Sequence, residues 1–244
     1  MLLASNAMAQ ALPCLIVPLV IGVIITIMVL AARAARQRQL ELEALARELG
    51  LAFDPSSVPR FDKNWPRFEC FSRGHSRRAF NLLSGALPEA THAGGRCLLG
   101  DYEFKETHSN GKTTQTVTYR FSFLILMTRW GETPDVLIRR ENFLDKIAGL
   151  LGFDDIDFES AEFSRKFMVK SSDKRFAYDL IDPQMMEFLL LDGTPNIDVG
   201  GGAVCFWYGQ NKRLDPAGLR SLFAWGTDFL HRWPRVVVAQ LDGK

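Results

Sequence analysis

Residues 96–129 read RCLLGDYEFKETHSNGKTTQTVTYRFSFLILMTR, and this stretch decides how the chain folds. An Asn-Gly pair at its centre, residues 110–111, is a strong signal for a two-residue β-hairpin turn. With that turn at the tip, apolar residues face each other on one side of the hairpin, and Asp101 meets Arg120 on the other. A slip by one residue would destroy both matches, so we predict a long antiparallel hairpin in this register. The predicted pairs are Phe104 with Val117, Tyr102 with Tyr119, Gly100 with Phe121, Leu98 with Phe123, Asp101 with Arg120, Glu103 with Thr118, and Lys105 with Thr116.

Short strands with helices at intervals continue along the rest of the chain. In Phe121–Met127, few polar residues alternate with the apolar ones, which predicts a strand that is buried on both faces of a sheet. A triple glycine, Gly200–Gly202, separates two strand-like runs and predicts a second hairpin. Antiparallel hairpins interrupted by helices predict an α+β fold, with the hairpins packed against helices, rather than a doubly wound sheet.

Aspartates mark the expected starts of the later helices. Asp182 and Asp215 each precede a proline, the order expected for an N-cap followed by the first helical residue. Asp173 is expected to cap a further helix in the same way. The other expected elements are a loop at 54–61, strands at 67–71, 134–142 and 163–170, a half-buried strand over 155–159, helices at 143–152 and 174–181, and a last helix that ends before Pro234.

The segment PCLIVPLVIGVIITIMVLAA, residues 13–32, carries no charged side chain. As a helix it would rise about 30 Å, the hydrocarbon thickness of a bilayer. A cleaved signal peptide is the alternative, but signal peptides begin with basic residues and have an apolar core of only about 7–15 residues. We therefore predict a short tail at 1–11 and a retained transmembrane helix at 12–33.

The charges that flank this segment predict its orientation. Arg33, Arg36 and Arg38 follow it directly, whereas the N-terminal side offers only the terminal amine. Positively charged flanks stay in the cytoplasm. We expect a single-pass protein of the cell inner membrane, in contact with the lipid bilayer, with its N-terminus outside and its C-terminal domain cytoplasmic.

Strong helix formers continue beyond the span and end at Gly50, a natural C-terminal cap. We predict a juxtamembrane helix at 34–50 and a soluble α+β domain at 51–244. The helix has an apolar stripe, and docking of this stripe on the domain is favoured over a coiled-coil stalk because it covers too few heptads. The stripe consists of Leu42, Leu45, Ala46 and Leu49.

Familiar catalytic and cofactor patterns do not occur in the sequence, and we expect no cofactor and no metal. Cys97 and His108 share one predicted hairpin, where the strand between them would span about 36 Å. A calcium loop beginning at Asp155 fails because its twelfth position is Lys166. Gly200–Gly202 precedes a strand rather than a helix, which argues against a phosphate cradle. The net charge of +1 does not favour a nucleic-acid binder.

One local basic cluster stands out in the body, the RGHSRR stretch from Arg73 to Arg78. Clustered arginines bind phosphates, so Arg73, His75, Arg77 and Arg78 are candidates for holding an anion. A solvated turn is the other interpretation, because no helix start or glycine-rich cradle accompanies the cluster.

Several stretches together resemble a widespread group of uncharacterised bacterial membrane-anchored proteins. The resemblance rests on an N-terminal helix, the aspartate–aromatic strand Asp101–Phe104 and the Phe-Ser-Arg stretch Phe163–Arg165. Phe167 stands where the group would have a tyrosine. The resemblance covers roughly residues 10–230 and implies a fold, but no activity.

These observations favour a non-enzymatic domain, tethered to the inner membrane, that binds a protein partner or regulates a membrane complex. Two alternatives remain open. One is a membrane-tethered enzyme of an unfamiliar type, and the other is a sensor of anionic lipid or a small ligand that uses the basic cluster. The sequence does not predict an oligomeric state.

Overall fold

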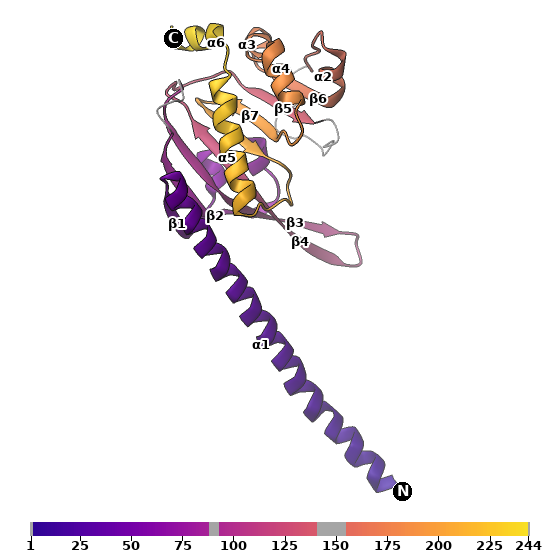
Figure 1. Cartoon of the computed structure of the whole chain (residues 1–244). Helices are drawn as coiled ribbons and strands as arrows, with labels where there is room; N and C mark the ends of the chain where they lie inside the picture. Colours follow the sequence, from indigo (N-terminus) through magenta and orange to yellow (C-terminus); the bar gives the residue numbers. More distant parts are fainter. Residues whose placement is uncertain (1, 88–92, 141–154, 244) are drawn as a thin grey trace. The chain divides into compact units, whose positions relative to one another are not determined.

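The computed structural model describes residues 2–87, 93–140 and 155–243. The chain divides into two compact units, Met1–Ala44 and Leu45–Lys244. The first unit is helical and belongs to α1 (Leu2–Leu49), whose last turn is part of the second unit (Figure 1). The tail predicted at 1–11 is therefore helical from Leu2 onward.

Among the described residues, one helix is long and apolar enough to cross a membrane, over Pro18–Leu49 within α1. The large apolar side chains between Leu19 and Leu30 expose 44–68% of their surface. Water does not favour such a continuous apolar surface, whereas the interior of a bilayer does. The structure and the sequence therefore both indicate that this helix is a candidate membrane span.

The last turn of α1 packs into the second unit, as predicted. Leu45 and Ala46 are buried there, and Gly50 ends the helix with a positive φ of 69°. Glu48 forms a bidentate ion pair with Arg220 of α5 (Pro216–His231), with an Nη2–Oε2 distance of 2.5 Å.

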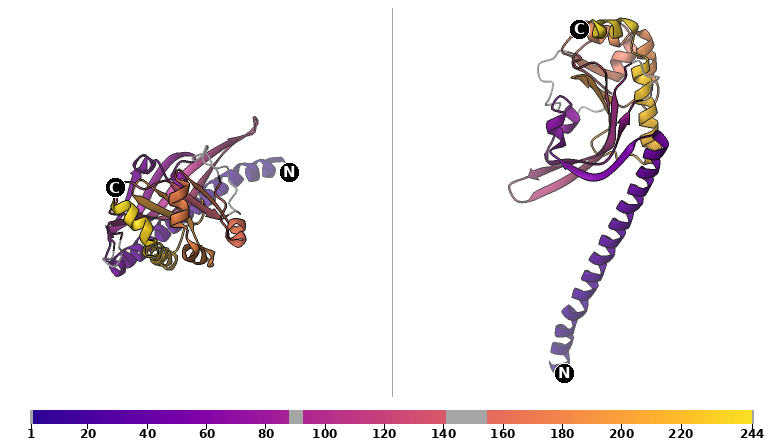
Figure 2. Two further views of the ribbon diagram at one scale, coloured as in Figure 1. Left: turned by 90° about the horizontal axis from the view of Figure 1, so that it is seen from above. Right: turned by 90° about the vertical axis from the view of Figure 1, so that its left-hand side faces the viewer.

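The second unit is built on an eight-stranded antiparallel sheet, which confirms the predicted α+β class (Figures 1 and 2). Its strand order is β1-β2-β3-β4-β8-β7-β5-β6. The strands are β1 (Ala52–Pro59), β2 (His75–Ala86), β3 (Arg96–Ser109), β4 (Thr114–Met127), β5 (Val136–Arg140), β6 (Phe167–Ser171), β7 (Asn196–Gly200) and β8 (Ala203–Trp207).

Different elements cover the two faces of the sheet, as the right-hand view of Figure 2 shows. On one face, Gly226 brings α5 so close that a Cβ at this position would lie 2.6 Å from Leu124. On the other face, the 3-10 helices η1 (Phe61–Asn64) and η2 (Glu69–Phe71) cover a cluster of aromatic side chains. The remaining helices are α2 (Ala161–Lys166), α3 (Lys174–Leu180), α4 (Pro183–Leu190) and α6 (Arg235–Asp242).

The long hairpin forms, but its predicted register is wrong by two residues. Tyr102 pairs with Phe121 rather than Tyr119, and Arg120 faces Glu103 rather than Asp101. The turn takes four residues because the Asn110 side chain accepts hydrogen bonds from the N–H groups of Lys112 and Thr113. Side chains alternate with a period of two, so this shift leaves every side chain on its predicted face.

Asp101, which the predicted register placed opposite Arg120, is instead fully buried. Its carboxylate accepts hydrogen bonds from Asn81 at 3.1 Å, Ser122 at 2.8 Å and Arg213 at 2.9 Å. The Ser122 hydroxyl also accepts from the Leu214 N–H, at 2.9 Å. The carboxylate therefore fixes the segment that leads into α5.

Three other predictions of local structure are corrected. The stretch 54–61 is mostly the edge strand β1, where proline is tolerated because one side of the strand is unpaired. The predicted strand at 67–71 contains η2 instead. The first part of the predicted strand 163–170, up to Lys166, belongs to α2. Ser160 caps this helix, because its side chain accepts a hydrogen bond from the Phe163 N–H.

Predictions based on local signals agree with the structure. Asp173, Asp182 and Asp215 each cap a helix by accepting a hydrogen bond from the backbone N–H three residues later. The second hairpin joins β7 and β8, and Phe121–Leu126 is completely buried. In 155–159, the apolar residues are buried as predicted, but the segment makes only an isolated bridge, from Asp155 to Lys170. The helix predicted at 143–152 lies outside the described residues, and α6 was not predicted.

Candidate functional site

The four residues of the basic cluster separate into different surroundings. Arg77 pairs with Asp62 at 2.8 Å, and Arg78 pairs with Glu103 at 3.0 Å. Arg73 pairs with Glu106 at 3.3 Å. The His75 ring nitrogens lie 3.1 Å from the Ser76 hydroxyl and 3.0 Å from the Thr107 hydroxyl. The cluster is therefore not one site, and its binding of an anion stays a prediction.

Arg77 and Arg78 line a shallow cavity of about 400 Å³, which we call the basic cavity. Residues before and within η1 complete it, because β1 runs antiparallel to β2 and ends opposite Arg78. Arg60 adopts a left-handed conformation with φ of 56°, and its N–H donates to the Arg77 carbonyl at 3.0 Å. The lining residues are Pro59, Arg60, Asp62, Lys63, Ser76, Arg77 and Arg78.

Among the described residues, four cations and one carboxylate line the basic cavity, so it presents a positive surface. The sequence cluster located two of the cations, Arg77 and Arg78. It missed Arg60 and Lys63, because only the pairing of β1 with β2 brings these distant residues to the same place.

A second polar assembly, formed by Glu69, Arg139 and Asp198, joins η2 to β5 and β7. Cross-strand pairing sets Leu137 beside Asp198, and Arg139 follows Leu137 on the same face of β5. Arg139 donates to the Glu69 carboxylate through Nη2, and Asp198 Oδ2 accepts from the Glu69 N–H at 3.0 Å. None of the three residues exposes more than 6% of its surface. We call this group the buried charge cluster.

Burial dominates the electrostatics of this cluster. Desolvation raises the pKa of Asp198 to about 8, although Arg139 and the hydrogen bond from the Glu69 backbone oppose the shift. Desolvation also raises the pKa of Glu69, and Arg139 again opposes the shift. Asp198 is therefore mostly protonated at neutral pH, and the cluster holds a proton that unfolding would release.

A cavity of about 260 Å³ adjoins Arg139, and we call it the Arg139 cavity. The Arg139 guanidinium lies over the Trp207 ring in a cation–π contact, with 5.3 Å between its central carbon and the ring centroid. Arg73, the first residue of the predicted anion site, lines this cavity rather than the basic one. The lining residues are Arg73, Tyr119, Arg139, Asn196, Trp207, Gly209, Gln210 and Asn211.

The buried charge cluster was not predicted from the sequence. A usable signal was present, because Arg139 and Asp198 are charged residues inside short apolar strands. Such residues are rarely buried without a partner. The partner, Glu69, could not be foreseen, because it lies on a 3-10 helix where we predicted a strand.

The cysteines of the body are buried and far from a reactive state. Cys70 and Cys205 lie with their sulfur atoms 3.7 Å apart, and burial raises the pKa of both thiols. Burial also raises the pKa of Cys97 to about 11. Within the described ranges, no group of three or more His, Cys, Asp or Glu side chains is arranged to hold a metal ion.

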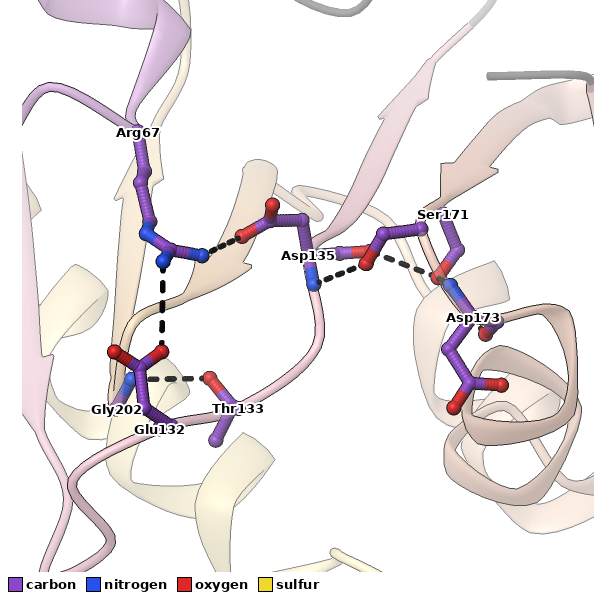
Figure 3. A network of polar contacts seen from close by, with 8 residues as sticks. Arg67, Glu132, Thr133, Asp135, Ser171, Asp173 and Gly202 are labelled. Atoms are coloured by element: carbon purple, nitrogen blue, oxygen red, sulfur yellow. Dashed lines mark hydrogen bonds and ion pairs between the residues drawn. The ribbon is translucent and has the colours of Figure 1, made fainter.

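A further polar network holds elements together at the β4–β5 connection (Figure 3). Arg67 binds Asp135 at 3.0 Å and Glu132 at 3.5 Å. The Ser171 hydroxyl donates to the carbonyls of Asp135 and Asp173, at 2.7 and 2.9 Å. These bonds join the segment before η2 to the turn before α3, which indicates a structural role for the network.

Comparison with known proteins supports the fold and assigns no family. No protein-family model and no curated protein sequence matches the chain. Among solved structures, the chain is similar to the crystal structure of the mycobacterial trehalose monomycolate transport factor A, TtfA, with a TM-score of 0.56 and 14% identity. The match covers 82% of this chain and 97% of the TtfA chain in that crystal structure. At this identity the likeness shows a shared fold alone, and membership of the uncharacterised bacterial group stays a prediction.

Proposed function

We propose that this protein is a membrane-tethered, non-enzymatic accessory module that binds a protein partner at the inner membrane. The observation that carries the proposal is the combination of an apolar helix long enough to span a bilayer with a body that has the fold of TtfA. TtfA is a transport factor, so an accessory role beside a membrane transport complex is the corresponding class of function for this chain.

We further propose that the body faces the cytosol, because Arg33, Arg36 and Arg38 follow the apolar segment. The three buried free cysteines suit a reducing compartment. A reporter fused after Lys244 tests this orientation. Green fluorescent protein should fluoresce there, and alkaline phosphatase should be inactive. Active alkaline phosphatase would contradict the cytosolic placement.

A partner can be sought by crosslinking in intact cells, followed by purification of the full chain from solubilised membranes. The control is residues 1–50 fused to an unrelated soluble domain, which keeps the anchor and removes the body. We expect an integral membrane protein in stoichiometric amounts with the full chain and not with the control. Recovery of the same proteins with both would contradict a partner-binding body.

The basic cavity favours a second candidate, the binding of anionic lipid headgroups. Cationic residues near a membrane surface each contribute about 1 kcal/mol of attraction to anionic lipid. This candidate can be tested by amide hydrogen exchange of the full chain in nanodiscs. Backbone amides around Arg60 and Lys63 should exchange more slowly in phosphatidylglycerol than in phosphatidylcholine. The double change Arg60→Gln and Lys63→Gln should remove this difference, whereas the exposed control pair Lys112→Gln and Arg165→Gln should keep it. Equal protection in both lipids would reject this candidate.

A further inference from the structure

The Arg139 cavity has the electrostatic character of a site for an anion. Within the part of the chain that the structure describes, eight residues line it, and they include two guanidinium groups, Arg73 and Arg139, and no acidic residue. The carboxylates that pair with these arginines, on Glu106 and Glu69, are not part of the lining. An entering ligand therefore meets two cations and, among the described lining residues, no carboxylate.

Arg139 is incompletely satisfied by the protein. A guanidinium has five N–H donors, and Arg139 uses Nη2 for Glu69. Its Nε is buried and has no hydrogen-bond partner among the described residues, and only 6% of the residue is exposed. A buried donor without an acceptor costs about 1–3 kcal/mol, so the fold keeps Arg139 at this position at a cost to stability.

The rest of the lining suits an organic molecule rather than a bare ion. Trp207 and Tyr119 offer aromatic surface, and Asn196, Gln210 and Asn211 offer amide groups. Ligand pockets for larger molecules measure about 300–1,000 Å³. At about 260 Å³, this cavity accommodates only a small molecule.

We propose that the Arg139 cavity binds a small organic acid through its carboxylate, which Arg139 and Arg73 hold between them. Arginine is suited to this role because its planar fork matches the two oxygens of a carboxylate. The cation–π contact with Trp207 helps to hold the Arg139 guanidinium beside the cavity. The binding is independent of the proposed protein partner, and it is measured on the purified chain alone.

The test uses the full chain in detergent micelles and two probes of the same shape. 4-Fluorobenzoate carries the carboxylate, whereas 4-fluorobenzamide is neutral, and fluorine NMR line widths report the binding of each. We expect the acid to bind at least tenfold more tightly than the amide, which corresponds to about 1.4 kcal/mol. Equal binding of the two probes, or a Kd for the acid weaker than about 10 mM, would overturn the proposal.

Substitutions locate the site. Arg139→Lys keeps the charge but loses the fork, and Arg73→Gln removes a cation whose side chain is 26% exposed. Both should weaken binding of the acid at least tenfold. Arg77→Gln, in the basic cavity, is the matched control and should leave binding unchanged. If Arg139→Lys loses its near-UV circular dichroism, this variant has lost its tertiary packing, and the result for Arg73→Gln alone decides whether the site is assigned correctly. Full binding by Arg73→Gln, or loss in Arg77→Gln, would contradict the assignment.

Discussion

Asp198 keeps a carboxyl group in the interior, where burial raises its pKa from 3.8 to about 8. Below about pH 4, the group is protonated in both the folded and the unfolded chain. Between pH 4 and 8 the unfolded chain loses this proton, whereas the folded chain keeps it. The free energy of unfolding therefore falls as pH rises through this window. Glu69, whose pKa is also raised, contributes a change of the same sign.

This linkage predicts that Asp198→Asn makes stability less dependent on pH. One retained proton corresponds to a slope of about 1.4 kcal/mol per pH unit, and the variant lacks that contribution. Asparagine keeps the acceptor for the Glu69 N–H. Urea unfolding at pH 5, 6, 7 and 8, followed by circular dichroism, measures the effect. The variant should gain stability relative to the natural protein from pH 5 to 8, and parallel curves would show that Asp198 does not carry the shift.

The buried thiols give a second prediction at this scale. Cys70, Cys97 and Cys205 should resist N-ethylmaleimide at pH 7.5 in the folded chain, because they are covered and burial holds their pKa values above the usual range. All three should react in urea. Mass spectrometry of the peptides measures both states, and rapid labelling of Cys70 or Cys205 without urea would contradict the packing under η2.

Among the elements, the register of the β3–β4 hairpin is open to direct test. A double-mutant cycle of Glu103→Gln and Arg120→Gln should give a coupling energy of about 1 kcal/mol, because these side chains pair at 2.6 Å. The equivalent cycle of Asp101→Asn and Arg120→Gln should give less than about 0.5 kcal/mol, because Asp101 binds Arg213 instead. Thermal unfolding measures both cycles. A larger coupling in the second cycle would restore the register that the Asn-Gly pair predicted.

Some helices and strands could be predicted from the sequence, and others could not. Helix starts at Asp173, Asp182 and Asp215 were predicted correctly, because an N-cap depends on residues three positions apart. The prediction of a strand at 67–71 was wrong. Its apolar residues pack against the core from a 3-10 helix, η2, which lies outside the sheet. The hairpin register depended on a side-chain hydrogen bond at Asn110, which the residue pair alone does not reveal.

Each candidate site is formed by residues that are distant in the sequence, so the sequence alone could not predict a complete site. Arg77 and Arg78 were named from the sequence, and the structure places them with Arg60 and Lys63, which were not. Glu69, Arg139 and Asp198 come from three distant segments, and their contacts depend on the order of the strands. Local patterns contain the charges, but only the sheet topology determines which charges meet.

The proposed function requires that the apolar part of α1 is a permanent membrane anchor for the body. Alkaline carbonate extraction of cell membranes, followed by intact-mass analysis of the pellet and the supernatant, tests this claim most directly. We expect the chain in the pellet at its full mass, because carbonate removes peripheral proteins and leaves spanning helices in the bilayer. Release into the supernatant, or a mass that lacks the apolar segment, would contradict the account.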